Sequence, residues 1–96
     1  MVMTPLDNCL EAVRKRIKQT KDPDARSELV AIRNELTALK KNRILAELDK
    51  DAEKYRALIG KLGAIRKAIK ETADAIEAAS KAAALLAQIA TLLAGV

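Results

Sequence analysis

The chain has 96 residues and a formal net charge of +5, and half of its residues are apolar, mainly alanine, leucine and isoleucine, with one aromatic residue, Tyr55. This palette favours packed helices over sheets and predicts an all-α protein. The chain has no histidine and a single cysteine, Cys9, so it lacks the commonest general base, the ligands of a Cys-rich zinc site and any internal disulfide.

The first predicted helix covers residues 5–20. Thr4 is suited to cap it and Pro5 to occupy its first position. Apolar residues with helical spacing follow, namely Leu6, Cys9, Leu10, Val13 and Ile17. Pro23, preceded by Asp22, predicts that this helix ends and a second one begins after a very short linker.

The second predicted helix covers residues 23–59, and its apolar residues alternate steps of three and four, the heptad rhythm of coiled coils. The step from Leu39 to Leu45 is six, which indicates either a local change of supercoil or a break with Asn42 as its C-terminal residue. We expect continuity, because nothing directly after Asn42 resembles an N-cap.

Residues 60–63 form the predicted turn, because Gly60 can adopt the left-handed conformation that ends a helix and Gly63 follows closely. The result would be a long antiparallel helical hairpin after the short first helix. The alternative is a single rod of roughly 105 Å from residue 24 to residue 94.

The third predicted helix covers residues 64–94 and changes character along its length. Before Ala78 it has one narrow apolar stripe, and beyond that residue it is apolar nearly all round, which is typical of a helix buried on all sides. We therefore expect a homo-oligomeric helical bundle that associates through this alanine-rich segment. The predicted surface consists of Ala79, Ala82, Ala83, Leu86, Ile89, Ala90 and Leu93.

Basic residues gather near the predicted turn, where residues 61–70 contain no acidic residue. The candidate contacts to an anion or an acidic partner are Lys61, Arg66, Lys67 and Lys70. Two further basic clusters lie at residues 14–21 and 40–43. A solvated helix face is the simpler interpretation, because the chain has no known DNA-binding motif and no aromatic platform for bases.

Carboxylates gather only at Glu47, Asp49, Asp51 and Glu53, where Lys50 and Lys54 alternate with them. Catalysis or metal binding there would need convergence from other elements, so we expect no catalytic, metal-binding or cofactor-binding residue. Acidic and basic residues four positions apart should support exposed helix faces. These pairs are Glu11–Lys15, Lys67–Glu71, Lys70–Asp74 and Glu77–Lys81.

Together these patterns predict one helical domain, residues 1–96, that acts without catalysis as a protein–protein interaction or assembly module. Its expected partners are copies of itself and an unidentified protein. The alternatives are a nucleic-acid-binding accessory protein that uses its basic helix faces and a membrane-active helical protein. We expect a cytoplasmic location, because residues 1–7 do not resemble a signal peptide and the longest uncharged run, residues 82–96, is too short to span a bilayer.

Overall fold

The structure is a computed structural model that describes residues 3–42 and 50–94. This part of the chain contains four α-helices. They are α1 (Met3–Gln19), α2 (Pro23–Lys40), α4 (Ala52–Glu71) and α5 (Ala75–Ala94). No strand occurs in these ranges. The prediction of an all-α protein is therefore confirmed.

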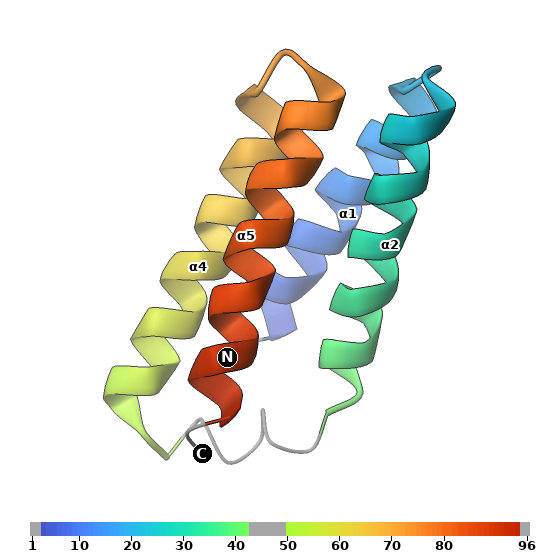
Figure 1. The fold of residues 1–96 in the computed structure, drawn as a ribbon. Helices are drawn as coiled ribbons and strands as arrows, with labels where there is room; N and C mark the ends of the chain where they lie inside the picture. The colour runs from blue at the N-terminus through green and yellow to red at the C-terminus, as the bar shows by residue number, and fades with distance from the viewer. Residues whose placement is uncertain (1–2, 43–49, 95–96) are drawn as a thin grey trace.

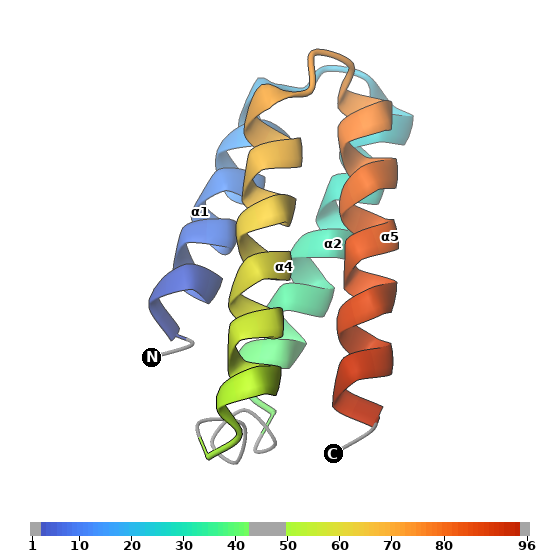
Figure 2. The ribbon, with the colours of Figure 1, turned by 90° about the vertical axis from the view of Figure 1, so that its left-hand side faces the viewer.

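The helices form two antiparallel hairpins, α1–α2 and α4–α5, that pack side by side (Figure 1). α1 packs against α2 and α4, and α5 packs against the same two helices, so α1 and α5 lie diagonally opposite each other. Both hairpin turns lie at one end of the bundle, as the second view also shows (Figure 2). Consequently α1 runs parallel to α4, and α2 runs parallel to α5. The molecule measures 41 × 20 × 19 Å.

The first break in the chain lies where the sequence predicts it. The Asp22 carboxylate accepts a hydrogen bond from the backbone N–H of Asp24 at 3.2 Å, and Pro23 occupies the first position of α2. The Thr20 hydroxyl donates to the carbonyl of Arg16 at 2.7 Å, which satisfies one of the free carbonyls at the end of α1.

The predicted second helix, residues 23–59, is wrong, because α2 ends at Lys40 and α4 begins at Ala52. The backbone N–H groups of Lys41 and Asn42 close the last turn of α2 on the carbonyls of residues 38 and 39. The cap of α4 is Asp51, whose carboxylate accepts from the backbone N–H of Lys54 at 3.2 Å. The change of stripe after Leu39 thus marks a real break, and the next N-cap lies farther along the chain than expected. Leu45 lies outside the described residues.

The predicted turn at residues 60–63 is also wrong, because both glycines lie within α4 and neither has a positive φ. They lie on the exposed side of the helix. The opposite side is fully buried and consists of Leu58, Leu62, Ile65 and Ile69. Burial of this stripe outweighs the cost of about 1 kcal/mol that each glycine imposes on a helix relative to alanine.

The predicted third helix, residues 64–94, is interrupted at residues 72–74. Thr72 ends α4 with an extended backbone, φ −77° and ψ 120°. The Asp74 carboxylate then accepts hydrogen bonds from the backbone N–H groups of Ile76 at 2.9 Å and Glu77 at 3.3 Å. The predicted long hairpin is therefore wrong, and α5 instead folds back on the shorter α4, with Asp74 rather than a glycine at the turn.

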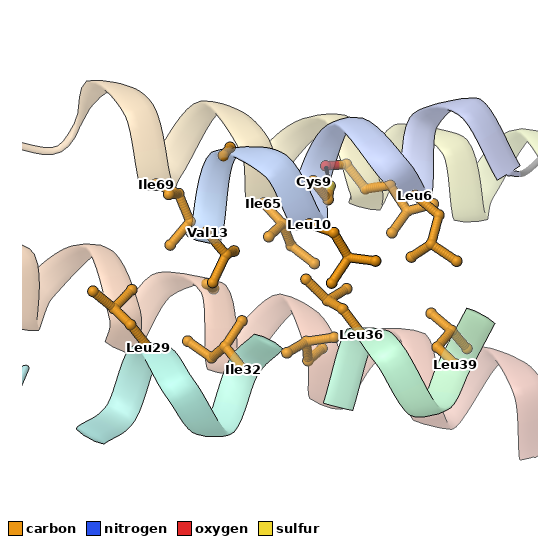
Figure 3. Close-up of a cluster of buried hydrophobic side chains, with 14 of the residues drawn as sticks. Leu6, Cys9, Leu10, Val13, Leu29, Ile32, Leu36, Leu39, Ile65 and Ile69 are labelled. Carbon is orange, nitrogen blue, oxygen red and sulfur yellow. Dashed lines mark hydrogen bonds between the residues drawn. The ribbon is translucent and has the colours of Figure 1, made fainter. Parts of the chain in front are cut away.

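The core is built from one apolar stripe of each helix, and side chains of α1, α2 and α4 point toward one another between the helices (Figure 3). The α1 stripe is the predicted one, buried throughout. At the end that carries both turns, the Arg16 guanidinium donates to the carbonyls of Ile69 at 3.2 Å and Ala73 at 2.8 Å. This cation therefore closes the C-terminal end of α4, where free carbonyls give a negative potential.

Candidate interaction surfaces

The exposed side of α5 next to α2 carries a line of residues that are small except for Ile76. We call this line the outer seam, and it consists of Ile76, Ser80, Ala83, Ala87, Ala90 and Ala94. Its steps are four, three, four, three and four, which is the heptad spacing of a coiled-coil contact. Ile76 is 44% exposed and is the only large hydrophobic side chain in the described residues to be exposed.

A groove of about 420 Å³ runs beside the outer seam, between α5 and α2. The α2 wall contains Glu35, Ala38 and Leu39, and Asn42 extends it just after the end of α2. The α5 wall contains three residues of the outer seam together with the more deeply placed Leu86, Ile89 and Leu93. The groove is therefore mainly apolar, and the outer seam forms its rim.

The predicted association residues lie in the core, in this groove or in both, since Leu86 and Ile89 belong to the core and also line the groove. Ala79 and Ala82 are buried inside the bundle, so their contacts are made within one chain. The other five line the groove, namely Ala83, Leu86, Ile89, Ala90 and Leu93. The expectation that α5 is buried on all sides is wrong for a single chain, because its outer face is exposed.

The sequence contains the outer seam, but the predicted apolar stripe mixed its members with those of the buried face. The alternation of four and three steps also holds for a second exposed line of α5, which is polar except for one alanine, namely Glu77, Lys81, Ala84, Gln88 and Thr91. Spacing alone therefore does not identify the seam, and its uncharged composition, with four alanines and one serine, is the signal that could have separated it.

α5 also satisfies the length and composition of a membrane-crossing helix, and only 28% of its most apolar stretch is buried in the bundle. This is the one helix of the described residues that does so. Its exposed face nevertheless carries Glu77, Lys81, Gln88 and Thr91.

A second groove, of about 260 Å³, lies between α1 and α4, and we call it the basic groove. Its charged lining is Glu11, Lys15, Arg16, Arg66 and Lys70. Asn8 and Gln19 add side-chain amides. The groove thus brings together cations that lie about 50 residues apart in the sequence.

The four predicted basic residues do not act as one group. Arg66 and Lys70 line the basic groove, whereas Lys67 lies beside it and approaches Glu71 at 4.0 Å. Lys61 faces α5, where its ammonium donates to the Gln88 side chain at 2.8 Å. No sequence signal could have added Lys15 to this group. Its place beside Arg66 and Lys70 depends on how α1 packs on α4.

Cys9 is fully buried where α1 contacts α4, as expected, and its thiol donates to the carbonyl of Leu62 at 2.7 Å. Burial raises the pKa of the Cys9 thiol to about 11, and a backbone hydrogen bond and the charge of Arg66 offset only part of this rise. The thiol is therefore protonated at neutral pH and is a weak nucleophile.

The carboxylate cluster does not assemble into a site in the residues that the structure describes. Asp51 caps α4 and Glu53 is exposed, while Glu47 and Asp49 lie outside the described residues. Across residues 3–42 and 50–94, no three His, Cys, Asp or Glu side chains are close enough to hold a metal ion.

Of the expected helix-face ion pairs, Lys67–Glu71 and Glu77–Lys81 form, at 4.0 and 3.4 Å. Asp74 instead uses its carboxylate to cap α5.

The chain matches no known protein family, no curated protein and no solved structure. The grooves and the outer seam are therefore interpreted from their own chemistry.

Proposed function

We propose that this protein is a non-enzymatic assembly module that forms an antiparallel homodimer through the outer seam of α5. The observation that carries the proposal is the seam itself, six exposed and uncharged positions in heptad register along a whole helix. Small residues at these positions allow two helices to approach to about 8 Å, the short end of the usual range.

The spacing of the seam is the same when it is followed in either direction along α5. This symmetry favours a second, antiparallel copy of the chain as the partner. A copy that places Ala83 opposite Ala87 also places Ser80 opposite Ala90 and Ile76 opposite Ala94. The one bulky residue of each seam thereby meets a small one, so no pair of bulky side chains collides. A two-fold interface of this kind uses the same surface on both subunits.

The polar residues beside the seam favour a helix over lipid as the partner. Lys81 pairs with Glu77 at 3.4 Å, and the Thr91 hydroxyl donates to the carbonyl of Ala87 at 3.1 Å. The ion pair and the hydroxyl are both compatible with the polar, hydrated rim of a protein interface. Insertion of α5 into a bilayer would instead take the ion pair out of water, at a cost of several kcal/mol.

The test is the mass of the protein in solution, measured by light scattering after size-exclusion chromatography over a range of concentrations. The expected species has twice the 10.4 kDa mass of one chain. Ala87→Glu places two buried charges near the two-fold axis and should weaken the dimer at least a hundredfold. Ala84→Glu is the matched control, because Ala84 is exposed on the same helix but lies outside the seam.

Disulfide trapping tests the orientation. Ser80→Cys and Ala90→Cys, each prepared with Cys9→Ala, should form a mixed disulfide when the two proteins are combined and oxidised. Each variant alone should cross-link poorly, because residues 80 and 90 do not meet their own copies in the antiparallel register. Efficient cross-linking of each variant with itself would indicate a parallel pair and contradict the proposal, as would a monomer at all concentrations.

A further inference from the structure

The parallel packing of α1 and α4 joins two basic clusters into one. Cys9 contacts Leu62 and Arg16 contacts Ile69, and both pairs are separated by 53 positions, so the two helices keep a constant register. In that register Lys15 lies across the basic groove from Arg66 and Lys70. Because both helices end at the same end of the bundle, the cations of their last turns also gather there.

The cations of the basic groove are poorly compensated within the chain. Glu11 is the only acidic residue in its lining. Among the described residues, Lys15, Arg66 and Lys70 form no ion pair with a carboxylate. Arg16 donates to backbone carbonyls, so its charge remains and adds to the positive potential.

We propose that the basic groove binds the phosphate backbone of a single-stranded nucleic acid without preference for base sequence. Its lining extends from Asn8 to Gln19 along α1, about 16 Å at the helical rise of 1.5 Å per residue. This length accommodates about five phosphates of a stacked strand at 3.4 Å each. The amides of Asn8 and Gln19 add donors of the kind that contact phosphate and sugar oxygens.

The composition of the groove favours a phosphate backbone over an acidic protein. Its only apolar lining residues, Ala12 and Ile69, are buried, so the groove offers no exposed apolar anchor. A protein interface needs such anchors in its centre, whereas phosphate contacts need only charge and donors. The lining contains no aromatic residue on which bases could stack, so the binding proposed here depends on phosphate contacts alone, which carry no information on base sequence.

The experiment is fluorescence anisotropy of a labelled 12-nucleotide oligo-dT, titrated with the full chain at several salt concentrations. Three or four neutralised phosphates should give a slope of about −2 to −3 for the logarithm of the association constant against that of salt concentration. Replacing both Lys15→Gln and Lys70→Gln should lower the affinity at least tenfold and reduce the slope by about 1.4.

The matched control is the double variant Lys41→Gln and Lys50→Gln, which removes the same charge from exposed positions outside the groove. Its affinity should stay within twofold of the unmodified chain. Three outcomes would each overturn the proposal. They are an equal loss of affinity in both double variants, equally tight binding of a 12-residue poly-glutamate, and no binding of the oligonucleotide at low salt. Circular dichroism of each variant verifies the fold, and Ala87→Glu should retain binding because the groove is independent of the α5 dimer.

Discussion

Gly60 and Gly63 illustrate how a single residue type can be misread when its surroundings are unknown. Both can end a helix, but both lie on the exposed side of α4 with negative φ. A Cβ atom added at either position would meet nothing within 4 Å. These glycines therefore weaken a helix that the buried leucines and isoleucines of its other side hold in place.

Gly60→Ala and Gly63→Ala should each raise the free energy of unfolding by about 0.5–1 kcal/mol, because alanine lowers the entropy of the unfolded chain and fits the helix without contact. Urea unfolding followed by circular dichroism measures the change, and Ala84→Gly at an exposed position of α5 should give a loss of similar size. Destabilisation by Gly60→Ala would show that this residue needs the left-handed conformation of a turn.

At the scale of the element, aspartates decide where helices begin. Asp22, Asp51 and Asp74 each accept a backbone N–H at the first turn of the helix that follows. The sequence predicts the first of these correctly because Pro23 follows directly. The other two lack a neighbouring proline, and Asp51 lies among alternating charges while Asp74 lies between two alanines, so neither differs locally from an exposed helical residue.

Asp74→Ala should lower the free energy of unfolding by about 1 kcal/mol, because it leaves the N–H groups of Ile76 and Glu77 without their acceptor at the start of α5. Thermal unfolding compared with Glu28→Ala isolates the cap, since Glu28 is an exposed acid of α2 and the charge change is the same. Equal midpoints for the two variants would contradict the turn at residues 72–74.

At the scale of the whole molecule, four helices of similar length cover one another more completely than a long hairpin would. Each apolar stripe of a four-helix ring meets two neighbours and the opposite helix, and all four stripes are buried here. The arrangement also creates two distinct outer surfaces. One helix from each hairpin, α1 and α4, forms the basic groove, and α5 leaves its seam exposed.

Small-angle X-ray scattering distinguishes these shapes. At concentrations where the chain is monomeric, the bundle predicts a radius of gyration close to the 13.0 Å of its Cα atoms, slightly increased by side chains and hydration. A continuous helix of roughly 105 Å would give roughly 30 Å, because it carries the same residues along a rod. A value near that of the rod would contradict the break between α2 and α4.

By itself the sequence determined the helical class, the first helix with its apolar stripe, and the turn at Pro23, because these depend on residues close together in the chain. The tertiary structure decided the other two breaks and the integrity of α4 across its glycines, since burial against other helices outweighs local preference. It also decided which face of α5 is free and which cations share a groove. Both depend on the parallel register of distant helices, which no local spacing encodes.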